Sequence, residues 1–411
     1  MALTEASPRS RFGLIDTLQV GSFRRLWFGT LAFGSAQQME MLILGWWILE
    51  VTNNPLLVGL MGGFRFWPSL LGPFGGVVAD RFDRRAVLLA VQGLTAVAGV
   101  LILVLAATGR LEVWHTFALT LVNGSARTID NATRQAAIGD LLPRERLING
   151  LALHQMASNG TAILAPVIGG ILYNRLGLTS GFAALAGLYV LGVAFTWSLP
   201  PLPIGAGKVV GSAWGKLIEG LDFVRRDQVI AALMLIAAIA NLCGYTLTFG
   251  MLPVFARDVL GTNTEGLGLM TSAVGAGSLL GGLTLGSLRS VGHRGRFVVA
   301  MMVSWMAVLV LFGLSRSFPV SLALLALNGA TATLSMSTVA AMLMDATPVA
   351  LRGRVMGVRG FVIVTLPVAT TAAGALTVAI GAPLTLILMA GLGGALTGLT
   401  VVRLPGLWRR A

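Results

Sequence analysis

Residues 75–85 read Gly-Gly-Val-Val-Ala-Asp-Arg-Phe-Asp-Arg-Arg, and they join two apolar runs, residues 55–79 and 86–108. A helix needs about 20 apolar residues to cross the hydrocarbon core of a bilayer, and each run is long enough. The arginine-rich stretch between them carries the charges that hydrocarbon excludes. It therefore predicts a tight loop at a membrane surface that joins two membrane-spanning helices.

The composition of the whole chain indicates the same class of protein. Of its 411 residues, 55% are hydrophobic and only 11% are charged, whereas a soluble globular protein carries about 25% charged residues. So few charges cannot cover a water-facing surface, which excludes an ordinary soluble enzyme. The single cysteine, Cys243, excludes a disulfide framework. We therefore predict an all-α membrane protein that crosses the bilayer many times.

Twelve apolar runs are long enough to span a bilayer. They occupy residues 23–50, 55–79, 86–108, 114–139, 147–175, 180–199, 228–255, 266–288, 297–314, 319–344, 355–380 and 383–404. The longest polar stretch, 200–227, becomes amphipathic in its second half, which is typical of a linker with a helix at the membrane surface. The predicted domains are a cytoplasmic segment (1–22), two six-helix bundles (23–199 and 228–404), the cytoplasmic linker (200–227) and a cytoplasmic tail (405–411).

The positions of the charges predict the orientation of the chain. It has 29 basic and 16 acidic residues, a net charge of +13. The basic residues cluster before the first run and after even-numbered runs, as Arg144 and Arg146 do after the fourth. By the positive-inside rule, both termini and these loops are cytoplasmic. No cleavable signal is visible in the polar first residues. We expect a multi-pass protein of the cell (inner) membrane with no nucleic-acid partner.

The two halves of the chain share a weak repeat. The fourth run ends in Asp140-Leu-Leu-Pro143, and the tenth ends in Asp345-Ala-Thr-Pro348. Repeated loops six spans apart in the same orientation imply two bundles related by an axis along the membrane normal. One cavity between the bundles is then the expected substrate site.

Several loops resemble those of a known family. Residues 75–85 resemble the loop between helices two and three of the major facilitator superfamily. Residues 133–149, 165–170 and 252–261 are similar to its enterobactin-exporter and macrolide-efflux branch. The resemblance spans nearly the whole chain, and it implies twelve helices in two bundles and export by alternating access.

Residues 165–170, Ala-Pro-Val-Ile-Gly-Gly, resemble the helix-five motif of the family's proton-coupled exporters. Ala165 stands where the family has glycine. Proline bends a helix and glycine thins its face, so this stretch suits a seam between bundles. The motif is equally compatible with plain helix packing.

In the family, the acid of the first loop pairs with helix eleven and holds the cytoplasmic side shut in the outward-facing state. The matching acid here is Asp80, and Arg354 or Arg359 can serve as its partner. Gly286 stands at the matching place in the second half, so the latch is one-sided. The resemblance implies a conformational latch formed by Gly76, Asp80, Arg81, Arg84, Arg85, Asp140, Asp345, Arg354 and Arg359. The alternative is a charged turn that only sets topology.

Ionisable residues in the middle of an apolar run are functional candidates, because a charge in hydrocarbon is costly unless it is paired or wetted. Glu40 and Arg65 lie at equal depth on neighbouring helices, which allows an ion pair. Arg127, Asp130 and Arg134 form one stripe on the fourth helix. We interpret Glu40 and Asp130 as proton-coupling candidates, with Glu40 favoured because it has fewer basic neighbours. Arg134 is interpreted as structural, and both groups are alternatively structural salt bridges.

Polar residues at mid-depth complete a cavity whose walls are mainly apolar, which suits an amphipathic organic molecule. The candidate cavity residues are Gln37, Arg65, Trp67, Arg127, Asn159, Asn241, Tyr245 and Asn328. Each uncharged polar residue can form an interhelical hydrogen bond instead. The three histidines are scattered, with His154 interpreted as structural, so we expect no metal site and no cofactor.

The sequence favours a transporter over an enzyme. We expect it to act as a monomer in the lipid bilayer and to export an amphipathic small molecule, such as a drug or a siderophore, in exchange for protons. Two alternatives keep the fold: a lipid or lysolipid translocator, and a proton-independent uniporter. A non-transporting scaffold or sensor is disfavoured by the charges at mid-membrane.

Overall fold

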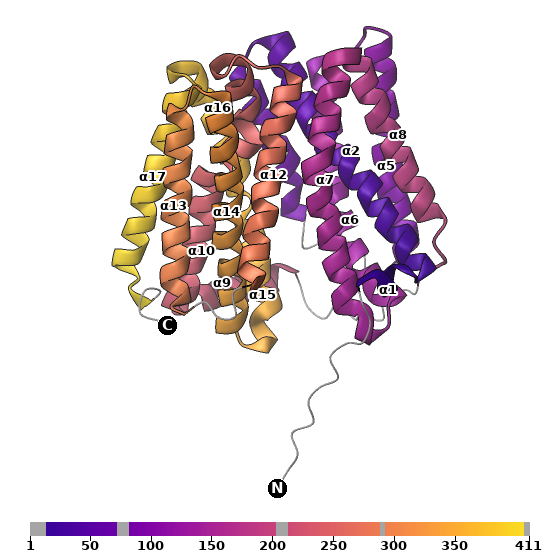
Figure 1. Cartoon of the computed structure of the whole chain (residues 1–411). Coiled ribbons are helices and arrows are strands. Elements are labelled where there is room, and N and C mark those ends of the chain that lie inside the picture. The colour runs from indigo at the N-terminus through magenta and orange to yellow at the C-terminus, as the bar shows by residue number, and fades with distance from the viewer. Residues whose placement is uncertain (1–13, 72–81, 203–212, 288–291, 407–411) are drawn as a thin grey trace.

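The computed structural model describes residues 14–71, 82–202, 213–287 and 292–406. In these residues the chain is built from helices that form two bundles, which stand side by side (Figure 1). The short first helix and the last turn of the final helix lie at the same end of the molecule. We name this end the terminal end and the other the opposite end.

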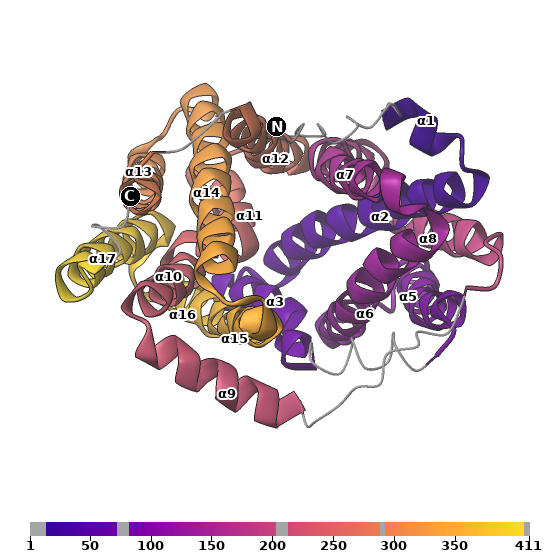
Figure 2. The ribbon, with the colours of Figure 1, turned by 90° about the horizontal axis from the view of Figure 1, so that it is seen from below.

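The N-terminal bundle is formed by the helices from α1 to α8. Their bounds are α1 (Leu14–Leu18), α2 (Gly21–Thr52), α3 (Pro55–Phe66) with the 3-10 turn η1 (Trp67–Leu71), α5 (Arg84–Ala107), α6 (Val113–Leu141), the 3-10 turn η2 (Arg144–Arg146), α7 (Leu147–Leu176) and α8 (Leu178–Trp197). Viewed from the terminal end, α3 and α7 lie on the side of this bundle that faces the C-terminal bundle, and α5 and α8 lie away from it (Figure 2).

The C-terminal bundle follows α9 (Ala213–Arg226), which lies against α15 (Figure 2). Its seventh span consists of α10 (Gln228–Ile239), the π-helical turns η3 (Ala240–Gly244) and η4 (Leu247–Met251), α11 (Leu252–Val254) and the π-helical turn η5 (Phe255–Val259). The other helices are α12 (Thr264–Ser287), α13 (Arg294–Leu314), α14 (Phe318–Ala346), the 3-10 turn η6 (Val349–Leu351), α15 (Arg352–Val362), α16 (Thr365–Ile380) and α17 (Ala382–Arg403).

The helix ends follow from local chemistry. Asn54, Asp83 and Asp227 cap α3, α5 and α10, because each side chain accepts a hydrogen bond from a free backbone amide of the first turn. Gly177 (φ +83°) and Gly381 (φ +81°) form one-residue connections between antiparallel helices. These positive φ angles are accessible to glycine without strain.

The helices agree closely with the predicted membrane spans. Where both ends are described, the helix bounds differ from the predicted runs by at most four residues. Among the described residues, nine helices are long and apolar enough to cross a membrane. Two others, α2 and α6, are long but carry polar side chains at mid-depth, and the described part of the second span is short. The chain is thus an all-α membrane protein with the predicted two-bundle architecture.

Small residues allow close packing within the C-terminal bundle. On α12, a Cβ at Gly277 would lie 1.8 Å from the carbonyl oxygen of Ala326 on α14. In return, a Cβ at Gly329 would lie 2.0 Å from the carbonyl oxygen of Val274. The two helix backbones are therefore in contact, as is common where lipid gives no hydrophobic drive for association.

This contact predicts opposite effects for two glycines of α12. Gly277→Ala should lower the free energy of unfolding by about 1–3 kcal/mol, because the new methyl group forces the backbones apart. Gly282→Ala should leave stability unchanged or raise it, since the nearest atom to its Cβ is 4.0 Å away and alanine favours helix. Thermal unfolding of the purified proteins in detergent measures both. Equal melting temperatures would contradict the packing described here.

Candidate functional site

Two glycines of α3 form one half of the seam between the bundles. A Cβ at Gly59 would lie 2.3 Å from the carbonyl oxygen of Thr370 on α16. One turn further, a Cβ at Gly62 would lie 2.0 Å from the carbonyl oxygen of Phe249 in η4. The backbone of α3 therefore touches the C-terminal bundle directly.

The other half of the seam joins α7 to α12. Thr264 Oγ1 donates a hydrogen bond of 3.0 Å to the carbonyl oxygen of Gly170. The α12 backbone also packs against Gly170, because a Cβ there would lie 2.3 Å from the carbonyl oxygen of Thr264. A Cβ at Gly268 would lie 2.6 Å from the carbonyl oxygen of Pro166. The prediction that residues 165–170 form a bundle seam is confirmed.

Polar contacts join the bundles at the opposite end. Arg257 donates hydrogen bonds to the Leu49 carbonyl (2.7 Å) and to Asn53 Oδ1 (2.6 Å) at the end of α2. Arg175, near the end of α7, forms an ion pair of 3.0 Å with Glu265 in the first turn of α12. Together with the glycine contacts, they hold the two bundles together at the opposite end, where the helices of the two bundles lie close (Figure 1).

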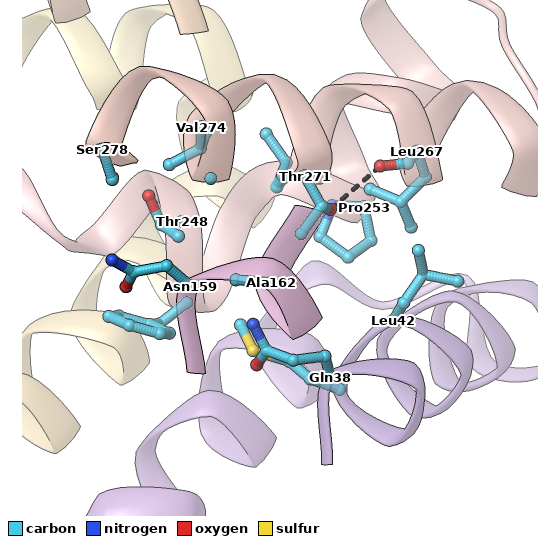
Figure 3. A pocket seen from close by; sticks show the side chains of 14 residues that line it. Gln38, Leu42, Asn159, Ala162, Thr248, Pro253, Leu267, Thr271, Val274 and Ser278 are labelled. Atoms are coloured by element: carbon cyan, nitrogen blue, oxygen red, sulfur yellow. Dashed lines mark hydrogen bonds between the residues drawn. The ribbon is translucent and has the colours of Figure 1, made fainter. Parts of the chain in front are cut away.

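A cavity of about 240 Å³ lies at mid-depth between the bundles, and we name it the junction cavity. Side chains from α2 and α7 face side chains from the seventh span and α12 across it (Figure 3). It is lined by Gln38, Met41, Leu42, Asn159, Ala162, Thr248, Phe249, Leu252, Pro253, Leu267, Thr271, Val274, Gly275 and Ser278. An apolar wall with a few polar groups is typical of a small-molecule site.

A second cavity of about 300 Å³, the N-bundle cavity, extends from mid-depth toward the terminal end. It shares Gln38 and Phe249 with the junction cavity, so the two adjoin. Unlike the junction cavity, it is strongly polar. Its charged and polar lining includes Gln37, Arg65, Arg127, Asp130, Asn131, Arg134, His154 and Ser158.

Glu40 is fully buried, but it does not pair with Arg65 as equal depth suggested. Its Oε2 accepts hydrogen bonds from Tyr189 (2.5 Å) and from the amide of Asn123. Arg65 instead points one nitrogen at the Gln37 carbonyl at 3.5 Å. The predicted direct ion pair is therefore wrong, because the carboxylate turns toward α6 and α8. Arg65 still attracts Glu40 electrostatically without touching it.

Asp130 and Arg134 form the charged core of the N-terminal bundle. Arg134 donates to both carboxylate oxygens, with Nη2 2.9 Å from Oδ1 and Nε 3.0 Å from Oδ2. Gln92 donates a third hydrogen bond of 2.7 Å to Asp130. Arg134 thus forms the salt bridge that its structural interpretation requires. Arg127 lies outside this pair, with its guanidinium 5.4 Å from the centre of the Phe66 ring.

The candidates of the C-terminal bundle lie within that bundle and not on the cavity walls. Asn328 is buried and accepts a hydrogen bond of 2.7 Å from Trp305. Tyr245 packs edge-on against the same tryptophan ring, and Asn241 donates to the carbonyl of Val362. The side chains of all three residues are thus engaged in contacts between helices of the C-terminal bundle. Trp67 is half exposed and lines neither of the two cavities.

The family of the chain is decided by comparison with known proteins. The family model described as Major Facilitator Superfamily matches residues 26–362. The chain belongs to the Major Facilitator Superfamily. It is therefore a membrane transporter of that family.

The named relatives of this chain share only a low sequence identity with it. The enterobactin exporter EntS of Shigella boydii serotype 4 (strain Sb227) is 24% identical over 336 residues, which cover 80% of this chain and 76% of the relative. EntS of Escherichia coli O139:H28 (strain E24377A / ETEC) matches with the same identity and coverage.

Solved structures of other transporters share the fold. A bacterial homologue of the human lysosomal transporter Spinster, in an inward-facing and unoccupied conformation, has a TM-score of 0.73 and 12% identity, and the match covers 98% of this chain and all of that one. The nucleoside transporter NupG has a TM-score of 0.73 and 14% identity, with 95% and 100% coverage. At such identities, the likeness concerns the fold alone.

Only part of the predicted loop latch lies within the described residues. Gly76, Asp80 and Arg81 lie outside the described residues, so the contact of Asp80 with helix eleven stays a prediction. Arg84 forms an ion pair with Asp140, and its counterpart Arg294 forms one of 2.5 Å with Asp345. The repeat therefore carries the same ion pair in both bundles.

The remaining latch candidates bind within one half of the chain. Arg85 donates to the carbonyl of Trp197 at 2.7 Å, which ties α5 to the end of α8. Arg354 pairs with Glu219 of α9 at 2.6 Å, which ties the linker helix to α15. Arg359 lies on the same helix, α15, near Tyr245.

Several residues that line the cavities were not predicted from the sequence. Gln38, Thr248, Thr271 and Ser278 line the junction cavity, and His154 lines the N-bundle cavity. Each is a polar side chain on a largely apolar helix, which is the only signal that the sequence offers. Asn159 and Gln37 carry the same signal and were found.

The charged core predicts unequal effects for the two arginines of α6. Arg134→Gln should lower the free energy of unfolding by about 3–5 kcal/mol, because Asp130 is then buried without its partner. Arg127→Gln should change stability little, since among the described residues Arg127 forms no ion pair. Thermal unfolding in detergent measures both. The double variant Asp130→Asn/Arg134→Gln should recover part of the loss, and equal effects of the two single variants would contradict this account.

Proposed function

We propose that this transporter exports an amphipathic small molecule, such as a drug or a siderophore, across the cell membrane by alternating access coupled to inward proton movement. The observation that carries the proposal is the junction cavity, which both bundles line and which the seam separates from the opposite end. A ligand bound there touches both halves of the protein, so a change in their tilt alters its access. In this proposal the terminal end is cytoplasmic, in agreement with the positive-inside rule.

The contacts at the opposite end are of a kind that can separate. The glycine contacts are van der Waals contacts between helix backbones, and the hydrogen bonds that Thr264 and Arg257 add go to carbonyl oxygens, to which water can donate instead when the bundles part. Arg175, one partner of the ion pair at this end, is mostly exposed, so water replaces its lost partner at small cost. Rocking of the bundles then opens the opposite end and closes the terminal end.

Glu40 is the group that we propose to carry the proton. It is fully buried, and its Oε1 has no hydrogen-bond partner among the described residues. It borders a cavity of about 10 Å³, next to Arg65 and Thr120, which is about the space of one water molecule. Asp130, by contrast, accepts three hydrogen bonds and is already satisfied. A carboxylate with one free oxygen beside a water-sized space is better suited to bind and release a proton.

The direction of transport is supported by the relatives. The curated relatives are named as exporters of enterobactin. Their identity of 24% supports the export role and does not extend to the same substrate.

The proposal is tested in everted vesicles or proteoliposomes with a compound that thermal-shift screening selects. Uptake into everted vesicles should follow an imposed pH gradient, and Glu40→Gln should abolish this dependence while substrate exchange without a gradient persists. Glu50→Gln is the matched control, because Glu50 lies on the same helix but is exposed at the opposite end. Gradient-driven uptake by Glu40→Gln would refute the proton role, and a failure to transport any screened binder would refute export.

A further inference from the structure

Two arginines meet at mid-depth in the N-terminal bundle. A Cβ at Gly124 on α6 would lie 2.4 Å from the carbonyl oxygen of Arg65, so α3 and α6 are in backbone contact at this level. Arg127 follows Gly124 by about one helical turn. Arg65 and Arg127 both line the N-bundle cavity, so two positive charges face the same space.

The charges around this cavity do not cancel. Asp130 and Arg134 neutralise each other through their ion pair. Glu40, which borders the small neighbouring cavity, offsets one of the two remaining arginines when it is ionised, and among the described residues Asp130 is the only acid that lines the N-bundle cavity. One positive charge therefore remains, or two when Glu40 is protonated. Because a net charge inside a bilayer is costly unless a counter-charge or water accompanies it, the cavity favours an anion.

The two guanidinium groups also have free donors. Among the described residues, neither Arg65 nor Arg127 forms an ion pair, and Arg65 Nε is buried without a hydrogen-bond partner. Guanidinium groups bind carboxylate-like anions through paired hydrogen bonds. An acidic group between these arginines would supply both the missing charge and the missing acceptor.

We propose that the transported molecule is an amphipathic organic anion, whose acidic group binds between Arg65 and Arg127 while its apolar body occupies the junction cavity. This rests on the proposed export function and narrows its substrate class. The two cavities adjoin at Gln38 and Phe249, so a single molecule can reach both. Leu42, Leu252 and Val274 supply the apolar wall for its body.

The charge of the substrate also agrees with the direction of transport. With Glu40 ionised, one monoanion brings the group of Glu40, Arg65 and Arg127 to neutrality. A membrane potential that is negative inside drives an anion outward. A cation would meet two unpaired arginines and would be repelled, and a neutral molecule would leave their charge uncompensated.

Three probes of nearly the same size and shape test the inference: naphthylacetate, naphthylacetamide and naphthylmethylammonium. Calorimetric titration of the purified protein should find that the acetate binds at least about tenfold more tightly than the amide, because it gains charged hydrogen bonds. The ammonium probe should bind most weakly. Arg127→Gln should remove the preference for acetate over amide, and Arg127→Lys should retain most of it.

The control variant is Arg225→Gln on α9, which removes an exposed arginine away from both cavities and should leave all three affinities unchanged. Should Arg127→Gln fail to fold, Arg65→Gln measures the same preference. Equal binding of acetate and amide, tighter binding of the ammonium probe, or no binding of the acetate would overturn the inference.

Transport of the probes separates this inference from the proposed function. If everted vesicles accumulate neutral or cationic compounds but not anions, export stands and the anion inference fails. If the acetate binds with the expected preference but no compound is transported, the anion site stands and the export proposal fails.

Discussion

The constraint on which the structure depends is that a charge inside the hydrocarbon must be neutralised by a partner or by water. In its described part, the N-terminal bundle carries five charged groups at mid-depth: Glu40, Arg65, Arg127, Asp130 and Arg134. Two of them pair fully, and the other three surround cavities. On the C-terminal side, the junction cavity is lined by apolar and uncharged polar residues. The N-terminal bundle thus holds the charged side chains, and the C-terminal bundle supplies an uncharged, mainly apolar surface to the junction cavity.

The seam between the bundles follows from a second property of the bilayer. Helices in lipid gain no hydrophobic energy by associating, so their contact depends on close packing of small residues. Gly59, Gly62, Gly170 and Gly268 bring backbones into contact, and side-chain hydrogen bonds such as the one from Thr264 to the Gly170 carbonyl add to this packing. Such a contact depends on close packing, which is compatible with the proposed rocking of the two bundles. Glycine crossings within the C-terminal bundle, such as Gly277 against Ala326, bring α12 and α14 into the same kind of backbone contact.

The sequence predicts those features of the fold and of the site that depend only on the position of a residue along its own helix. Hydropathy located the spans, and the spacing of four residues predicted the Asp130–Arg134 pair. Prediction from the sequence fails where the rotation or tilt of a helix decides which side chains meet. Equal depth suggested that Glu40 meets Arg65, yet the carboxylate turns to Asn123 and Tyr189. Depth likewise placed Asn328 at the cavity, but its partner is a tryptophan of the same bundle. The lining of the junction cavity depends on how the bundles lean together, which no local pattern encodes.

The central claim is that the two bundles move as units about the junction cavity. Distances between spin labels on a background without Cys243 test it most directly, with one pair at exposed Ile148 and Thr284 near the terminal end and another at exposed Leu176 and Asn263 near the opposite end. On addition of a transported compound or a change of pH, the first distance should shorten while the second lengthens. If both distances change in the same sense, or if one stays fixed while the other moves, the account is contradicted.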